Sequence, residues 1–188
     1  MELLCPKWLL CMDGSRQALE NHAVLIDQDT IVDVGPTKSL QSAYPQATVT
    51  KLDNQLLMPG LINCHTHTGM TLLRGAADDL ALHEWLQNRI WPLEGELADE
   101  HFVFDGTVLA CAEMLLGGTT TFNDMYFFPE STVSAATQLG ARVMAGIIAI
   151  EFPTRYGSGP DEYIEKSLAT RDQYKDNGLV HWSVAPHA

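Results

Sequence analysis

Beyond Met58-Pro59-Gly60 the chain alternates short apolar stretches with longer helical patterns, and this alternation limits its fold more than any other feature. The apolar stretches cover residues 61–64, 119–125, 142–150 and 179–186, and the helical patterns cover residues 100–116, 131–139 and 160–175. Ser131 is expected to cap the second helix and Gly140 to end it. Such alternation of strands and helices is typical of a parallel sheet.

Polar residues gather at the ends of these strands, most clearly at His65-Thr66-His67 and His187. Four parallel strands with right-handed crossovers and polar carboxyl ends predict the N-terminal half of a (β/α)₈ TIM-type barrel, whose sites lie at that end. Half a barrel would leave two sheet edges unpaired. An open doubly wound sheet is the alternative, but no strand is followed by a Gly-rich phosphate loop.

Residues 1–57 have a different pattern and predict a small β unit. The run from Ala23 to Gly35 contains two β-branched stretches around Gln28-Asp29, which indicates a hairpin. Strands at residues 8–12 and 48–52 are expected to flank it. Because so few short strands rarely close a core unaided, another element should cover this sheet. The expected domains are therefore residues 1–57 and 58–188.

Charge and cysteine usage exclude several classes of protein. The chain carries 24 acidic and 11 basic side chains, a net charge of −13, which argues against nucleic acid and anionic membranes as partners. The four cysteines, Cys5, Cys11, Cys64 and Cys111, lack the spacing of a disulfide framework, so we expect a soluble cytoplasmic protein. The first residues fit neither a signal peptide nor a membrane span.

His65-Thr66-His67 is the motif that carries chemistry. Residues i and i+2 of a strand project from the same face, so both imidazoles can reach one ion. Neutral imidazole is a common zinc ligand. A bare pair of this kind is usually incidental, but here a Pro-Gly turn and an apolar strand precede it. The sequence therefore predicts a zinc site at His65 and His67.

This arrangement resembles the amidohydrolase superfamily, in which a composite β-sandwich built from both chain ends accompanies a metal-bearing barrel. The likeness continues through residues 71–76, 79–80, 84–86 and 91–94, which look like the deaminase and chlorohydrolase branch. Within that branch the chain is most similar to deaminases of 5-methylthioadenosine and S-adenosylhomocysteine.

The resemblance implies hydrolytic deamination of an adenine nucleoside, giving the inosine analogue and ammonia. Zinc bound by imidazoles lowers the pKa of its water to about 7, which provides hydroxide for attack on the purine ring. The partner would be a small nucleoside, and the enzyme could form a homo-oligomer.

The resemblance also assigns roles to residues. His65 and His67 match metal ligands, Glu94 matches a carboxylate that binds the ribose hydroxyls, and His187 matches a histidine that contacts substrate. Without the resemblance, Glu94 would be interpreted as a solvated helix carboxylate. Binuclear relatives use a carboxylated lysine on the fourth strand, and residues 179–188 contain no lysine, so one zinc per chain is expected.

Other residues leave alternatives open. Where some relatives carry an arginine that contacts substrate, this chain has Ile147, with Arg155 nearby as a replacement. Asp124 and Glu113 are carboxylates for which we expect structural hydrogen bonds and no catalytic role. A final set could line an apolar slot for a thioether or purine, or could simply belong to the core: Met70, Trp85, Trp91 and Met125.

The resemblance places the remaining metal ligands and the proton-shuttling glutamate on strands beyond residue 188, so no catalytic residue is assigned here. We therefore expect a fragment with little activity of its own. One alternative is another amidohydrolase, acting on guanine, cytosine or a triazine. A second is an inactive half-barrel that pairs with itself through its open edges.

Overall fold

The computed structural model describes residues 1–15 and 17–187, which form two compact units. The first unit is Met1–Pro59 and the second begins at Gly60. The last residue of the expected second domain, Ala188, lies outside the described residues. Within these residues no helix is long and apolar enough to cross a membrane.

The first unit is a four-stranded sheet with the order β3-β2-β1-β4. Its strands are β1 (Glu2–Leu9), β2 (His22–Asp27), β3 (Thr30–Pro36) and β4 (Thr48–Leu57). Strands β2 and β3 form the expected antiparallel hairpin, and Gln28 takes the left-handed conformation in its turn. Strand β1 runs antiparallel to β2 and parallel to β4.

This unit differs from the pattern expected from the sequence in two places. Strand β1 begins at Glu2 and contains Pro6, whereas the sequence placed a strand at residues 8–12. Pro6 is tolerated because β1 pairs with β2 only from Glu2 to Leu4, so no partner on that side needs its missing N–H. The unit also contains a helix that no sequence pattern had indicated, α1 (Thr37–Ala43). Its Leu40 belongs to the same core cluster as Leu3, so α1 is the element that covers the sheet.

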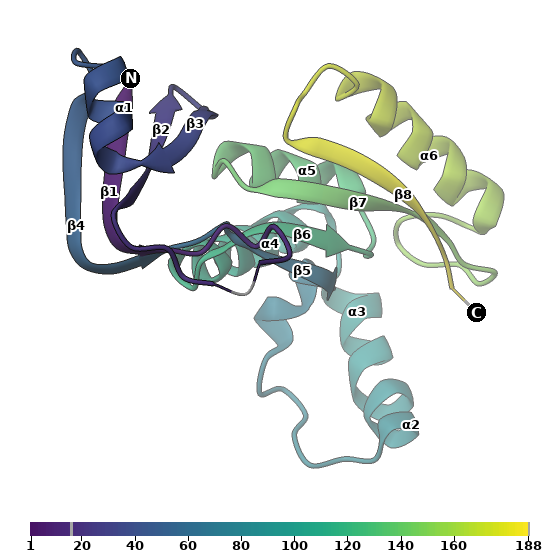
Figure 1. Cartoon of the computed structure of the whole chain (residues 1–188). Helices are drawn as coiled ribbons and strands as arrows, with labels where there is room; N and C mark the ends of the chain where they lie inside the picture. Colours follow the sequence, from purple (N-terminus) through teal and green to yellow (C-terminus); the bar gives the residue numbers. More distant parts are fainter. Residues whose placement is uncertain (16, 188) are drawn as a thin grey trace. The chain divides into compact units, whose positions relative to one another are not determined.

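The second unit is built on a four-stranded parallel sheet, as the alternating pattern predicted (Figure 1). The strands, in the order β5-β6-β7-β8, are Leu61–Thr66, Thr119–Asp124, Arg142–Ala149 and Val180–Pro186. The helices between them are α4 (Glu100–Leu116), α5 (Pro129–Gln138) and α6 (Pro160–Gln173). Helix α4 has the predicted bounds and begins after Asp99, whose side chain accepts a hydrogen bond from Phe102 N at 2.9 Å.

Helix α5 begins two residues before the predicted cap. Its first residue is Pro129, and Ser131 is a buried residue of the first turn. Proline suits this position because its fixed φ matches the helix and an N–H there would have no helical acceptor. The turn into the helix passes through Phe128, which has a φ of 52°. Ser131 is therefore not the cap.

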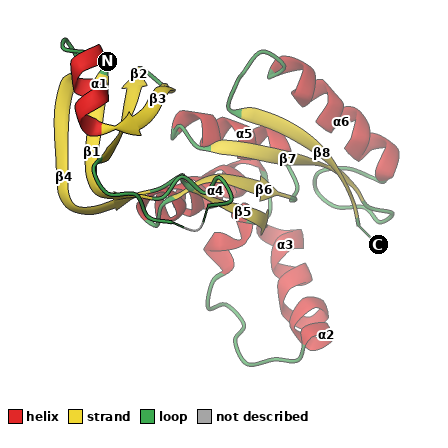
Figure 2. Ribbon diagram, in the orientation of Figure 1, coloured by secondary structure: helices red, strands yellow, loops and turns green. Residues whose placement is uncertain are grey.

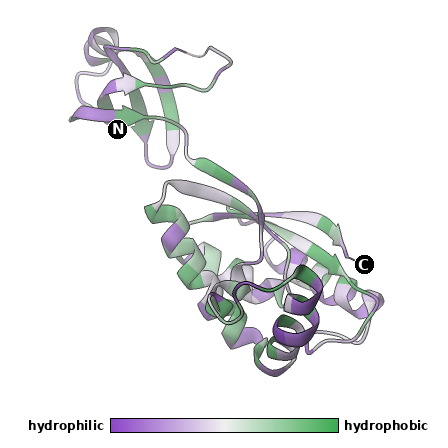
Figure 3. Ribbon diagram, turned by 90° about the horizontal axis from the view of Figure 1, so that it is seen from below, coloured by the Kyte–Doolittle hydropathy of each residue, from purple (hydrophilic) through white to green (hydrophobic). Residues whose placement is uncertain are grey.

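The core of the second unit lies between the sheet and its helices. Phe122, Val143 and Val180 from the strands pack with Cys111 of α4 and Val133 of α5. The helices of this unit carry both hydrophobic and hydrophilic stretches (Figure 3), as expected for helices with one side on the sheet. Parallel strands with helices between them thus bring the carboxyl ends of β5 to β8 to one edge.

A long excursion separates β5 from α4. It contains a 3₁₀ turn (Thr68–Leu73), α2 (Leu82–Trp85), a π-helical turn (Leu86–Ile90) and α3 (Trp91–Leu97). The part that carries α2 and α3 projects away from the sheet (Figures 1 and 2). Helix α4 holds the 3₁₀ turn closely, because a Cβ on Gly106 would lie 2.4 Å from the carbonyl oxygen of Gly69.

Candidate active site

The two histidines of the motif lie together at the carboxyl end of β5. Their ring centroids are 4.8 Å apart in an edge-on arrangement. His67 Nδ1 lies 2.6 Å from the carbonyl oxygen of Met125, at the end of the neighbouring strand. A carbonyl only accepts hydrogen bonds, so Nδ1 carries a proton, and in the neutral imidazole Nε2 is then left with a free lone pair. This is the arrangement of a metal-ligating histidine held by a backbone acceptor.

A cavity of about 560 Å³ opens beside His67. Its walls include Glu94 from α3 and His187 from the end of β8. The structure therefore brings three of the four predicted site residues to one cavity, although 120 positions separate His67 from His187 in the sequence. His65 lies beside His67 but does not line this cavity.

Glu94 is half-buried. Its sequence context alone had suggested a solvated carboxylate. Its Oε1 accepts a hydrogen bond of 2.8 Å from the hydroxyl of Tyr126. Burial raises the pKa of the Glu94 carboxyl, while the Tyr126 hydrogen bond and the proximity of His67 oppose that rise. One carboxylate oxygen is thus fixed and the other is available to a ligand.

The apolar wall of the cavity contains every residue that the sequence offered for an apolar slot: Met70, Trp85, Trp91 and Met125. Phe127, Phe128 and Ile148 line it as well. Ile147, the position that the resemblance matches to an arginine of some relatives, is buried and does not line the cavity. Adjacent strand residues face opposite sides, so a side chain at position 147 points away from the cavity that Ile148 lines.

Arg155 lines the cavity but is engaged elsewhere. Its guanidinium donates to the carbonyl oxygen of Glu96 at 2.7 Å and lies 3.6 Å from a carboxylate oxygen of Asp99. These contacts connect the loop after β7 to the end of α3 and the start of α4. A substrate contact by Arg155 would have to compete with them.

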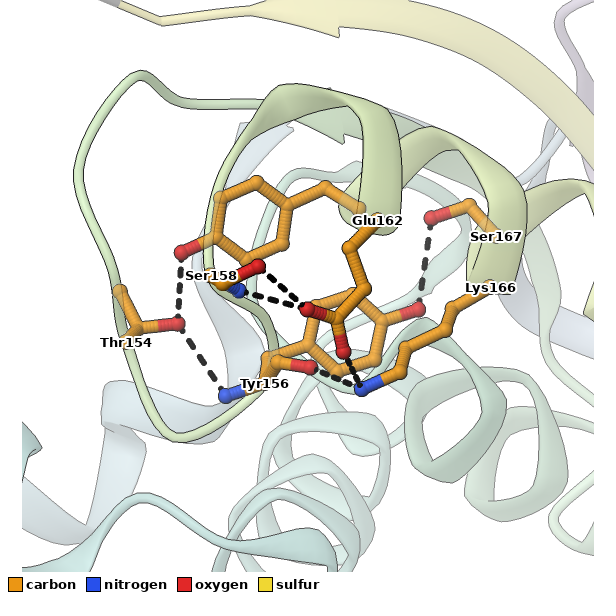
Figure 4. A network of polar contacts seen from close by, with 7 residues as sticks. Thr154, Tyr156, Ser158, Glu162, Lys166 and Ser167 are labelled. Atoms are coloured by element: carbon orange, nitrogen blue, oxygen red, sulfur yellow. Dashed lines mark hydrogen bonds and ion pairs between the residues drawn. The ribbon is translucent and has the colours of Figure 1, made fainter.

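The same loop forms one wall of the cavity through residues 152–156. Figure 4 shows how α6 holds it: Lys166 reaches Glu162 at 2.6 Å and the backbone oxygen of Tyr156 at 2.5 Å. Glu162 also accepts hydrogen bonds from the backbone N–H and the hydroxyl of Ser158, at 2.8 and 2.7 Å. These contacts hold the loop in place as a wall of the cavity.

Asp124 and Glu113, the two carboxylates expected to be structural, differ in burial. Asp124 is buried and accepts hydrogen bonds from Thr66 and Thr68, as expected for a structural carboxylate. Glu113 also has a structural partner, because it forms a bidentate pair with Arg74 at 2.7 and 2.9 Å, but it is exposed. The Arg74 hydrogen bonds lower the pKa of Glu113.

Tyr126 is the site residue that the sequence analysis missed. It lies two residues after β6, lines the cavity, and its ring is 6.4 Å from that of His67. The signal was its position, because residues at the carboxyl ends of parallel strands meet at one edge of the sheet.

The two imidazoles fit a zinc ion as part of its ligand set. Zinc in proteins normally has four ligands, of which three or four come from the chain. Among the described residues no group of three or more His, Cys, Asp and Glu side chains is arranged to hold a metal. If a zinc ion binds here, His65 and His67 would supply two of its ligands.

Comparisons with known proteins show which families the chain resembles. Residues 56–188 match the model of the amidohydrolase family, and residues 23–47 match a bacterial imidazolonepropionase-like composite domain. A 5-methylthioadenosine/S-adenosylhomocysteine deaminase of Saccharophagus degradans is 46% identical over 99% of this chain, and one of Thermodesulfovibrio yellowstonii is 44% identical over 97%. The chain spans 42% of the length of each of these relatives.

A solved structure is similar in fold as well as in sequence. The zinc-bound crystal structure of an adenosine deaminase from Xanthomonas campestris superposes with a TM-score of 0.87 at 39% identity. The match covers 98% of this chain and 42% of that one.

Proposed function

The chain belongs to the amidohydrolase family, and from this premise we propose that it is part of a zinc-dependent hydrolase that deaminates adenine nucleosides. Relatives named 5-methylthioadenosine/S-adenosylhomocysteine deaminase and a neighbour named adenosine deaminase support hydrolytic deamination as the reaction class. The proposed substrates are 5′-methylthioadenosine and S-adenosylhomocysteine, and the proposed products are their inosine analogues and ammonia.

The observation that carries this proposal is the cavity that unites His67, Glu94 and His187. A nucleoside needs an apolar surface for its purine and a polar acceptor for its ribose. Met70, Trp85 and Trp91 offer the first, and the free oxygen of Glu94 offers the second. A single site with both features suits a nucleoside better than a bare heterocycle.

Each residue has a distinct proposed task. His65 and His67 would hold the zinc ion, which when bound supplies Lewis-acid activation of water at neutral pH. Glu94 would accept hydrogen bonds from the ribose hydroxyls and so orient the purine toward the metal. His187 would contact the substrate from the end of β8. The aromatic wall would exclude bulk water from the reacting carbon.

The proposed architecture is the first half of a (β/α)₈ barrel at residues 58–188, preceded by strands of a composite β-sandwich at residues 1–57. The parallel order β5-β6-β7-β8 and the composite-domain match to residues 23–47 support it. We also propose a cytoplasmic location, because the described structure leaves all four cysteines as free thiols. If the half-barrel exists on its own, a homo-oligomer that forms through the unpaired edges of its sheet is the proposed alternative.

The first test is the zinc content of the purified chain, measured by plasma mass spectrometry beside a His65→Ala/His67→Ala double variant. We expect zinc to bind the parent chain and to be lost from the double variant. Equal zinc in both proteins would contradict the proposed metal site.

Nucleoside binding is the second part of this test, and it does not depend on catalysis. Chemical shifts of the tryptophan indole N–H groups of Trp85 and Trp91 should change on titration with 5′-methylthioadenosine. Guanine or a triazine should have a weaker effect, because neither carries ribose hydroxyls for Glu94. Tighter binding of guanine or the triazine would favour another amidohydrolase activity.

A further inference from the structure

Asp124 occupies an unusual position beside the proposed metal ligands. It ends β6, is 3% exposed, and lies opposite Thr66 in the register of β5 and β6. Burial raises the pKa of its carboxyl, and hydrogen bonds from Thr68 and Thr66 oppose that rise. No cationic side chain forms an ion pair with it within residues 1–15 and 17–187. A buried carboxylate without a cation normally destabilises a fold, so its contacts need an explanation.

Asp124 contacts both sequence neighbours of His67, Thr66 and Thr68. One oxygen of Asp124, Oδ1, accepts from the backbone N–H of Thr68 at 2.7 Å. The same oxygen lies 2.8 Å from the hydroxyl of Thr66, whose single proton is shared with the carbonyl oxygen of Asn123 at 2.9 Å. The carboxylate thus holds the backbone immediately before and immediately after the histidine.

Met125, the residue that follows β6, completes the arrangement. The N–H of Met125 donates to the carbonyl oxygen of Thr66 at 3.1 Å, and the carbonyl oxygen of Met125 accepts from His67 Nδ1 at 2.6 Å. The turn that follows has little room to shift, because a Cβ on Gly69 would lie 2.7 Å from the ring of Tyr126. The His67 ring is therefore fixed by contacts that come mainly from the end of β6.

We infer that Asp124 is a positioning residue for His67. Its carboxylate holds Thr66 and Thr68 so that His67 donates through Nδ1 to the Met125 carbonyl and presents Nε2 at the carboxyl edge of the sheet. This inference rests on the proposed function only in taking Nε2 as the atom that meets the metal. Partners of ligating histidines fix the tautomer in this way, and their loss typically lowers metal affinity about 10- to 100-fold.

The tautomer of His67 can be measured in the metal-free chain. Long-range ¹H–¹⁵N NMR under mildly alkaline conditions, where imidazole is neutral, distinguishes a protonated Nδ1 from a protonated Nε2. In the parent chain we expect His67 to be protonated at Nδ1. In Asp124→Ala and in the milder Thr66→Val, which removes only the hydroxyl, we expect a mixture of both tautomers. A parent His67 protonated at Nε2, or an unchanged tautomer in both variants, would overturn the inference.

Two further variants separate positioning from general loss of stability. Asp124→Asn keeps an oxygen that can accept from Thr66 and Thr68, so it should retain the parent tautomer. Val180→Ala removes packing from β8, which pairs with β7 and not with β6, and should leave the tautomer unchanged. If Val180→Ala altered the tautomer as much as Asp124→Ala, Asp124 would have only a structural role.

Titration with Zn²⁺ alone then distinguishes this inference from the proposed function. We expect the zinc affinity of Asp124→Ala to fall about tenfold and that of Asp124→Asn to change less. A tautomer change without any change in zinc affinity would support the positioning of His67 but overturn its role as a metal ligand. A fall in affinity with an unchanged tautomer would support the metal site and overturn the positioning role of Asp124.

Discussion

At the scale of single residues, burial and hydrogen-bond partners distinguish three glutamates of this chain. Glu94 and Glu96 lie on the same short helix, yet only Glu94 lines the cavity and accepts from Tyr126. Glu113 is as acidic as either but is exposed and paired with Arg74. Three carboxylates of one chemical type thus have three different environments, and only one of them can meet a nucleoside in the cavity.

Glu94→Gln tests the ribose contact. A neutral amide accepts weaker hydrogen bonds than a carboxylate, and hydrogen bonds to charged groups contribute about 1.5–3 kcal/mol. We therefore expect affinity for adenosine to fall about tenfold or more, while affinity for 2′,3′-dideoxyadenosine stays unchanged. NMR titration of the chain with both nucleosides provides the measurement.

Glu96→Gln is the matched control, because Glu96 is exposed on the same helix and does not line the cavity. It should leave both affinities unchanged. Equal losses for adenosine and the dideoxy analogue in Glu94→Gln would contradict a contact with the ribose hydroxyls.

Glu162 gives the chain a predictable response to acid. Hydrogen bonds from Lys166 and Ser158 lower the pKa of its carboxyl from 4.5 to about 2. A carboxyl group whose pKa is lower in the folded than in the unfolded state stabilises the fold at any pH above its unfolded pKa. This stabilisation is lost as the pH falls toward the pKa of the folded state. We expect Glu162→Gln to lower Tm at neutral pH and to match the parent chain near pH 2.

Thermal unfolding across this pH range is the measurement, with Glu165→Gln as the control. Glu165 is exposed on the same helix and forms no ion pair with any residue that the structure describes. Since the Glu162 side chain is 38% exposed, the change in Tm should be small and sensitive to salt. A difference that grows toward low pH would contradict the assigned direction.

At the scale of elements, the close approach of α4 to the 3₁₀ turn after His67 fixes the geometry near the site. Gly106 of α4 lies against the backbone of Gly69, and the hydroxyls of Thr68 and Thr107 are 3.0 Å apart. Helix and turn therefore pack backbone to backbone. A side chain at position 106 would separate them and shift the residues that follow His67.

Gly106→Ala should destabilise the chain although alanine favours helices. The added Cβ would meet the carbonyl oxygen of Gly69 at 2.4 Å, and backbone cannot move aside as a flexible side chain can. Overpacking of this kind costs about 1–3 kcal/mol, which exceeds the roughly 1 kcal/mol gained in helix propensity. Urea unfolding measures the net effect.

Gly95→Ala is the control substitution, since nothing lies within 4 Å of the added Cβ on α3. It should stabilise the chain by up to about 1 kcal/mol. If Gly106→Ala were equally stabilising, α4 and the 3₁₀ turn could not be packed as closely as described.

At the scale of the whole molecule, the sheet of the second unit has unpaired edges among the described residues. Strands β5 and β8 each have one edge that pairs with no other strand among the described residues. Ile62 on β5 is 67% exposed and Val184 on β8 is 73% exposed. Unpaired strand edges with exposed aliphatic side chains are typical sites of association.

We therefore expect the chain to associate with itself in a concentration-dependent manner. Charged residues on exposed edges prevent such pairing, so Ile62→Lys/Val184→Lys should shift the chain toward monomer. Leu116→Lys, which changes a 90% exposed residue at the end of α4, should have little effect. Sedimentation velocity over a range of concentrations is the measurement, and a parent chain that stays monomeric throughout would contradict the expectation.

The sequence by itself determined the features that depend on neighbouring residues. Apolar stretches separated by helical patterns predicted the parallel sheet and the bounds of α4. The spacing of His65 and His67 predicted that their side chains share one face, and their ring centroids are 4.8 Å apart. Strand pleat and helix repeat are local properties, so a short run of residues is enough to express them.

Only the tertiary structure decided the features that depend on distant residues. Pro6 lies inside a strand because β2 stops pairing before it, and α5 begins at Pro129 with Ser131 buried in its first turn. Tyr126 reaches Glu94, and His187 joins the cavity of His67, only because the sheet brings the ends of β5, β6 and β8 to one edge. Such contacts arise from the packing of whole elements against each other, which no local pattern encodes.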